Sequence, residues 1–88
     1  MVNYHLVFTE SGKDSIKSLD KNIQQRVFDK LKWFIQNIDN LTLLPLKSNL
    51  SGLYKLRVGN YRIIYEINCT DKVVSVHRVG HRKEIYKQ

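Results

Sequence analysis

The chain is poor in the residues that build cross-linked or metal-bound domains. Its 88 residues include one cysteine, one proline and four glycines. The single cysteine, Cys69, cannot form an internal disulfide, and it has no partners at the spacing of a zinc site. These shortages exclude disulfide scaffolds and zinc ribbons, and they agree with a reducing compartment.

Long apolar runs and targeting signals are missing as well. No apolar stretch approaches the roughly 20 residues that a membrane-spanning helix needs. The first residues, Met1 to Phe8, lack the basic start and the long apolar run of a signal peptide. We therefore expect a cytoplasmic protein with no membrane partner.

Acidic residues are few, and the shortage is uneven along the chain. Lys and Arg number 15 against 8 Asp and Glu, which gives a net charge of +7. Residues 1–44 carry six basic and five acidic side chains, whereas residues 45–88 carry nine and three. Charge gathered in one half of a small domain favours a polyanionic partner, either nucleic acid or an acidic protein segment. A solvated basic surface that aids solubility is the alternative.

The first half of the chain predicts a strand followed by two helices. A strand is expected over residues 4–9, and a short helix should start near Ser11, which forms a capping-box-like pair with Asp14. A longer helix should follow Asp20, because apolar residues then recur every three or four positions. These residues are Ile23, Val27, Leu31, Phe34 and Ile38. Trp33 lies at the edge of this stripe, where core packing is favoured over partner contact.

The second half predicts three strands joined by short turns, after a loop over residues 41–51. The strands cover residues 54–58, 61–67 and 72–79 and should form an antiparallel meander. With the N-terminal strand, the meander makes one four-stranded sheet with the helical hairpin on one face. The expected fold is thus a single α+β domain over residues 1–88. After Gly80 we expect either a helical turn or a loose tail.

The turn Gly59-Asn60 determines the register of the central hairpin, because Gly-Asn suits a two-residue connection. The register puts Leu56 and Ile63 on one face, and Lys55, Arg57 and Arg62 on the other. Arg57 and Arg62 then lie directly opposite each other. Two like charges in that arrangement repel, so the pair favours an anionic ligand.

The phase of the last strand stays open at this point. Apolar residues occupy both phases, as in a central strand. Either Val74 and Val76 face the core, or Val73 and Val79 do. His77 is predicted to be an ordinary strand histidine rather than a proton carrier.

The cations on this face can support RNA cleavage without a metal ion. The chain has no glycine-rich phosphate loop, no Ser-His-Asp set and no carboxylate cluster. RNA brings its own nucleophile, the 2′-hydroxyl, so the protein needs a base, cations around the phosphate and an acid for the 5′-oxygen. Lys55 can act as the base, Arg57 and Arg62 can grip the phosphate, and His81 can carry a proton. Tyr86 can stack on a nucleobase or position the phosphate.

Two blocks of the sequence resemble the RelE branch of the RelE/ParE toxin superfamily. They are Tyr54-Lys-Leu-Arg-Val-Gly-Asn-Tyr-Arg-Ile-Ile-Tyr-Glu66 and Val79-Gly-His-Arg-Lys-Glu-Ile-Tyr86. The predicted order of elements matches as well, so the resemblance covers nearly the whole chain. It implies a type II toxin, a metal-independent endoribonuclease that cleaves mRNA in the ribosomal A site and leaves a 2′,3′-cyclic phosphate.

The same resemblance implies partners and site residues. The partners are the ribosome with its mRNA and a RelB-like antitoxin, with promoter DNA bound only through the antitoxin complex; no cofactor is implied. The family's site residues fall on Lys55, Arg57, Arg62, Arg82 and Tyr86. The best-known RelE pattern has a lysine at position 57. If that lysine accepts the proton, Lys55 or His81 must do so here.

Further cations complete the expected site, and two other functions stay open. Lys47, Arg78 and Lys83 are predicted to bind RNA, although Lys83 can equally be a solvated surface lysine. One alternative function is a ParE-like toxin that inhibits DNA gyrase without cutting RNA. The other is an inactive relative that only binds an antitoxin.

Overall fold

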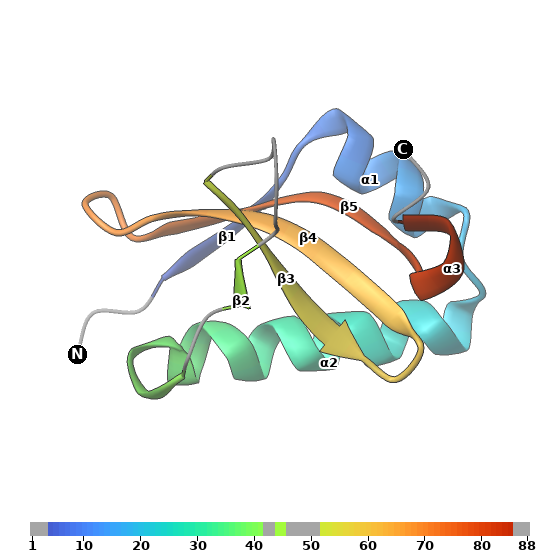
Figure 1. Cartoon of the computed structure of the whole chain (residues 1–88), viewed down its shortest axis with the longest axis horizontal. Helices are drawn as coiled ribbons and strands as arrows, with labels where there is room; N and C mark the ends of the chain where they lie inside the picture. Colours follow the sequence, from blue (N-terminus) through green and yellow to red (C-terminus); the bar gives the residue numbers. More distant parts are fainter. Residues whose placement is uncertain (1–3, 42–43, 46–51, 86–88) are drawn as a thin grey trace.

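The computed structural model describes residues 4–41, 44–45 and 52–85. The N-terminal half contains β1 (His5–Phe8), α1 (Glu10–Lys17), α2 (Lys21–Asn37), the short 3₁₀ turn η1 (Ile38–Asn40) and β2 (Leu44–Pro45). The C-terminal half contains β3 (Leu53–Val58), β4 (Tyr61–Asn68), β5 (Val73–His81) and α3 (Arg82–Ile85). Figure 1 shows how these elements are arranged. The predicted α+β order is confirmed, and the segment after Gly80 begins with the helical turn α3.

The sheet is mixed, with the strand order β1-β5-β4-β3-β2. The meander β3-β4-β5 is antiparallel, whereas β1 pairs with β5 in parallel. The two-residue strand β2 pairs with β3 and adds to the four strands predicted. The hairpin register is confirmed: Leu56 pairs with Ile63 and Arg57 with Arg62. Gly59 has φ of +58°, which suits the first position of a two-residue turn of type II′.

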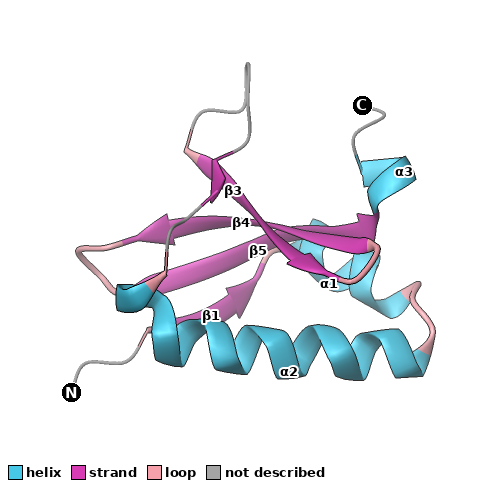
Figure 2. Ribbon diagram, turned by 60° about the horizontal axis from the view of Figure 1, so that its bottom comes forward, coloured by secondary structure: helices cyan, strands magenta, loops and turns pink. Residues whose placement is uncertain are grey.

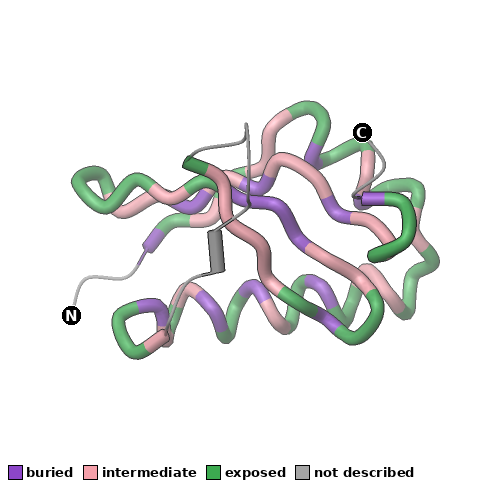
Figure 3. The backbone as a smooth tube through the Cα atoms, in the orientation of Figure 1, coloured by how far each residue is buried: buried purple, intermediate pink, exposed green. Residues whose placement is uncertain are grey.

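Both long helices pack on the same face of the sheet. Ile16 of α1 and Val27 and Leu31 of α2 share one buried cluster with Ile63 and Val76 of the sheet. A second cluster joins α2 to the other end of the sheet, mainly through the edge-to-face rings of Phe34 and Tyr65. Figure 2 shows α2 running along this face, and the buried segments in Figure 3 line the layer between helices and strands. No long helix of the described residues packs on the opposite face of the sheet.

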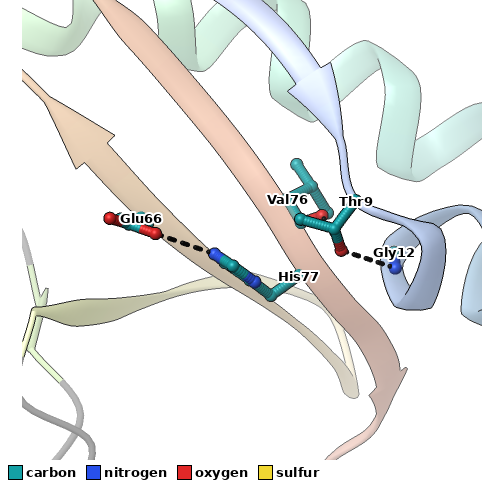
Figure 4. A network of polar contacts seen from close by, with 5 residues as sticks. All are labelled: Thr9, Gly12, Glu66, Val76 and His77. Carbon is teal, nitrogen blue, oxygen red and sulfur yellow. Dashed lines mark hydrogen bonds and ion pairs between the residues drawn. The ribbon is translucent and has the colours of Figure 1, made fainter.

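The helix α1 covers the edge of β5 where β1 ends. Thr9 caps this helix, since its Oγ1 accepts a hydrogen bond from the Gly12 N–H at 3.1 Å and itself donates to the Val76 carbonyl at 3.2 Å (Figure 4). Ser15 Oγ accepts a hydrogen bond from the Val79 N–H at 2.9 Å. This bond satisfies a backbone donor on the part of the β5 edge that β1 does not reach. The predicted cap at Ser11 is wrong, because Thr9 already bonds the first turn from the end of β1.

The helix α2 follows the predicted apolar stripe, but its aromatic residues do not all point inward. Val27, Leu31 and Phe34 are buried, whereas Trp33 is 42% exposed, with the Lys30 ammonium 4.3 Å from its ring centroid. The expectation of core packing for Trp33 is therefore wrong, since that side chain lies over solvent and a lysine. No helix in the described ranges is long and apolar enough to cross a bilayer.

Candidate functional site

The face of the sheet opposite α1 and α2 carries cations from β3, β4 and β5, and we call it the open face. One cross-strand row joins Arg57, Arg62 and Gly80, and the next joins Lys55, Ile64 and Arg78. Side chains at paired positions lie on the same face of a sheet, so both rows present their cations on one surface. The site predicted from the sequence thus has Lys55, Arg57, Arg62 and Arg78 together.

Arg62 has a structural partner that the sequence did not reveal. Its Nη1 donates to the carbonyls of Gly59 and Tyr61, both at 3.0 Å, so the guanidinium bends back over the hairpin turn. Arg57, directly opposite, is exposed. These hydrogen bonds offset part of the repulsion between the two arginines. Their pairing is therefore compatible with an anion but does not by itself require one.

The helix α3 brings Arg82 to the same end of the sheet. The Arg82 N–H donates to the Asn60 carbonyl at 2.8 Å, which ties the start of α3 to the hairpin turn. Ile85 is buried and packs against Gly80, where an added Cβ would lie 3.2 Å from its Cδ1. Figure 2 shows α3 on the side of the sheet away from α2. Arg82 therefore lies beside the Arg57–Arg62 row, as the proposed site requires.

A fourth arginine reaches this turn from the other face. A Cβ built on Gly59 would lie 2.7 Å from Nη2 of Arg26, a residue of α2. The guanidinium groups of Arg26 and Arg62 thus approach the same turn residue from opposite sides of the hairpin. Arg26 lies on α2, outside the apolar stripe that the sequence predicts for this helix. The contact depends on how α2 crosses the sheet, and no local pattern carries that information.

The structure puts His81 on the helix side of the sheet, away from the cations. It pairs with Tyr61, and the two rings meet edge-to-face with centroids 5.4 Å apart. Tyr61 alternates with Arg62 along β4 and lies on the same side as buried Ile63. His81 Nδ1 also accepts the Lys83 N–H at 3.1 Å. The expectation that His81 joins Arg57 and Arg62 on one face is therefore wrong.

His77 is the histidine that does lie on the open face. Ile64 pairs with Arg78 and Tyr65 with Val76, so the register skips His77 and β5 bulges there. The bulge also settles the phase of this strand: Val74 and Val76 face the core before it, and Val79 faces the core after it. His77 Nε2 lies 3.0 Å from the Glu66 carboxylate, as Figure 4 shows.

The arrangement can hold a phosphodiester but shows no metal-binding cluster in its described part. Arginines offer forked donors that match phosphate oxygens, and lysine adds a compact positive charge. Within residues 4–41, 44–45 and 52–85, no three His, Cys, Asp or Glu side chains come together as metal ligands would. The open face is therefore suited to bind an RNA backbone and to stabilise negative charge that develops on a phosphate.

Comparison with known proteins agrees with this geometry. The model of the family described as "ParE toxin of type II toxin-antitoxin system, parDE" matches residues 6–86. The chain belongs to the RelE/ParE toxin superfamily. It is therefore a toxin of the type II toxin–antitoxin class.

Relatives of this superfamily member carry RelE-type names. Toxin RelE of Mycobacterium tuberculosis is 24% identical over 84 residues, which cover 96% of this chain and 87% of that one. Toxin RelG of the same organism is 39% identical over 44 residues, about half the length of either chain. The M. tuberculosis toxin–antitoxin complex RelBE2 contains a similar fold, with a TM-score of 0.81 and 27% identity over 92% of this chain and all of that one. The RelE-like fold is thus established.

The remaining predicted site residues of this toxin are Lys83, Lys47 and Tyr86. Lys83 is exposed on α3, one position after Arg82. Lys47 and Tyr86 lie outside the described residues, so their predicted roles stay predictions. The superfamily's carried-over site therefore has four described members, which are Lys55, Arg57, Arg62 and Arg82.

Proposed function

We propose that this toxin is a ribosome-dependent endoribonuclease that cleaves mRNA in the A site. The observation that carries the proposal is the group of arginines at one end of the open face. Arg57 and Arg62 face each other there, and the backbone bond from Arg82 to Asn60 holds Arg82 beside them. A cation cluster at that place can surround one phosphate of a single-stranded chain.

The reaction uses the 2′-hydroxyl of the RNA as the nucleophile. Its oxygen attacks the adjacent phosphorus, the bond to the 5′-oxygen breaks, and a 2′,3′-cyclic phosphate remains. Arg57, Arg62 and Arg82 stabilise the charge on the phosphate oxygens in the transition state. The proton acceptor is a side chain of the open face other than an arginine, because guanidinium groups stay protonated in proteins.

The proposed partners follow from the same surface. A cognate antitoxin with acidic segments would cover the open face and block access of mRNA, and promoter DNA would be bound only by the toxin–antitoxin complex. The solved relative RelBE2 is a toxin–antitoxin complex, which supports such a partner. We propose that the toxin acts in the cytoplasm, where ribosomes and mRNA are present.

The test is to map transcript ends after a brief pulse of expression and to repeat the cut with purified ribosomes. We expect cleavage within codons, 2′,3′-cyclic phosphate ends, and no cleavage of the same mRNA without ribosomes. A DNA-damage response with intact transcripts would instead identify a gyrase inhibitor. Antitoxin binding without growth arrest would identify an inactive relative.

A further inference from the structure

Glu66 and His77 form a hydrogen-bonded pair on the open face that is not among the site residues implied by the superfamily. Nε2 of His77 lies 3.0 Å from Oε1 of Glu66, and the two side chains are 35% and 58% exposed. Both groups are therefore within reach of a ligand that lies on the sheet. Glu66 is also the only acidic residue in the strands described, on a face that carries the cations Lys55, Arg57, Arg62 and Arg78.

The bulge in β5 creates this pair. A regular strand would put His77 on the face opposite Arg78, because side chains alternate. The register instead skips from Arg78 to Val76, and His77 turns toward Glu66 on the open face. Bulges re-aim side chains in this way and are over-represented beside active sites. His77 consequently lies next to Arg78 on the same surface.

Charged groups from three strands surround the pair. Lys55 of β3 and Arg78 of β5 flank Ile64 in one cross-strand row, and Glu66 follows Ile64 by two positions on β4. Ile64 is buried, so the row has an apolar floor with a cation on each side. A phosphate held by Lys55 and Arg78 would lie next to the His77 ring. That phosphate would be on the 5′ side of the nucleotide whose 2′-hydroxyl attacks, and the scissile phosphate on its 3′ side would lie one row further on, at Arg57 and Arg62.

We propose that His77 is the proton acceptor for the 2′-hydroxyl and that Glu66 positions it. This inference rests on the proposed ribonuclease function. An ionised carboxylate only accepts hydrogen bonds, so in the neutral imidazole Nε2 carries the proton and Nδ1 keeps its lone pair. His77 takes the 2′-hydroxyl proton, the 2′-oxygen forms a bond to phosphorus, and the bond from phosphorus to the 5′-oxygen breaks. The 5′-oxygen leaves with a proton from water.

The structure also explains why the other candidates are less suited. His81 lies on the helix side and its Nδ1 already accepts the Lys83 N–H. Arg57 occupies the position of the family lysine, but a guanidinium cannot act as a base at neutral pH. Lys55 is the one remaining candidate among those predicted, and it serves in this proposal as a cation that holds the phosphate.

The test is single-turnover cleavage on ribosomes programmed with one mRNA. We expect His77→Gln to lower the rate by about 10²- to 10⁴-fold, the usual contribution of a general base. The pH profiles of the parent and of His77→Gln should differ in shape, because only the parent carries the proposed proton acceptor. His5→Gln is the matched control, because His5 is an exposed strand histidine on β1 and should leave the rate unchanged. Thermal unfolding of each variant shows whether the fold is kept.

Glu66→Gln tests the positioning role. Its loss should be smaller than that of His77→Gln, and the double variant should be no slower than His77→Gln alone, because Glu66 acts only through His77. Additive losses would show that Glu66 has a separate role.

Three outcomes would overturn the proposal. If His77→Gln cleaves at the parental rate, the acceptor lies elsewhere while the ribonuclease function stands. If Lys55→Met or His81→Gln, and not His77→Gln, removes the pH dependence, that residue is the acceptor. If the parent itself does not cut ribosome-bound mRNA, the proposed function fails and this inference falls with it.

Discussion

At the scale of single residues, Arg82 is the site residue whose substitution should affect function with the least effect on folding. Its backbone N–H bonds to Asn60, whereas its side chain is exposed. A substitution at this position keeps the backbone bond, so the start of α3 stays in place. Arg62 is less clean, since its guanidinium also bonds the carbonyls of the hairpin turn.

We expect Arg82→Ala to reduce ribosome-dependent cleavage by about 10²- to 10³-fold, the effect of removing one donor to a developing charge. The melting temperature should change little, because no described contact of the side chain is lost. Primer extension on a cleaved transcript and thermal unfolding measure the two effects. Lys32→Ala removes an exposed charge from α2 and is the control; a parental rate for Arg82→Ala would exclude the site assignment.

At the scale of elements, α1 packs very close to the backbone of β5 along the edge that β1 leaves uncovered. Gly12 lies in the first turn of α1, and a Cβ there would overlap the carbonyl of Val76. The overlap is with backbone, so a rotamer change cannot relieve it. Thr9 and Ser15 bond the same strand edge from either side of Gly12.

Gly12→Ala should therefore destabilise the fold, by about 1–3 kcal/mol, the usual cost of an added carbon in a packed site. Alanine has the better helix propensity, so an unchanged or raised stability would show that α1 can shift away from β5. Urea unfolding measures the difference. Lys13→Ala, an exposed position on the same helix, should change the free energy of unfolding by less than about 0.5 kcal/mol.

Local sequence patterns were enough to predict the helices, the strands and the central hairpin. Most features that the sequence did not predict depend on contacts between residues far apart in the chain. The turn Gly59-Asn60 and the alternation around Leu56 and Ile63 were enough for the register of β3 and β4. The parallel pairing of β1 with β5 joins residues 68 positions apart, such as His5 and Val73, and no local pattern encodes it.

The sequence was enough to place the site cations of β3 and β4 on one face, because the short turn between these two strands determines their register. The bulge in β5 puts His77 on the open face. The sequence holds one sign of this bulge: the core residues Val74 and Val76 are two positions apart, whereas Val76 and Val79 are three apart. Arg26 reaches the turn through the crossing of α2 over the sheet, which the sequence does not show.

At the scale of the whole molecule, charge should dominate RNA binding. The excess positive charge of residues 45–88 lies largely on β3, β4, β5 and α3. Each phosphate neutralised on a single strand contributes about −0.7 to the slope of log affinity against log salt. The open face is proposed to hold two phosphates, one at Lys55 and Arg78 and one at Arg57, Arg62 and Arg82, which predicts a slope of about −1.4 for a short RNA.

Fluorescence anisotropy between 50 and 300 mM salt measures this slope. Arg57→Ala should make the slope shallower, by at most about 0.7 because Arg62 and Arg82 still contact the same phosphate. Lys32→Ala should leave the slope unchanged, since Lys32 is exposed on α2, across the sheet from the open face. Equal slopes for both variants would mean that RNA does not bind the open face.

Two buried tyrosines, Tyr65 and Tyr4, should make the stability of the fold depend on pH in the alkaline range. Burial raises the pKa of Tyr65 above its ordinary value of 10, and the nearby Tyr54 adds to the shift. Burial is also the main cause that raises the pKa of Tyr4. The folded state therefore keeps protons that the unfolded chain releases above pH 10. This contribution to stability is complete below pH 10 and is lost as the pH rises further.

We expect the free energy of unfolding to fall above pH 10, with Tyr65 contributing up to about 1.4 kcal/mol per pH unit. Tyr65→Phe should reduce the steepness of that fall, although its stability at neutral pH also changes. Urea titrations from pH 8 to 11 measure it. Tyr61→Phe is the comparison, and an identical pH dependence for Tyr65→Phe and the parent would contradict the assignment.

The place of β5 in the sheet has a consequence for synthesis of the toxin. This strand lies between β1 and β4, yet it is translated after both of them. A nascent chain that has exposed only residues 1–72 has no neighbour for β1 and no edge for α1 to cover. The cationic surface is thus complete only once residues 73–81 are free to pair with β1 and β4, so a nascent chain that still lacks β5 cannot present the whole open face.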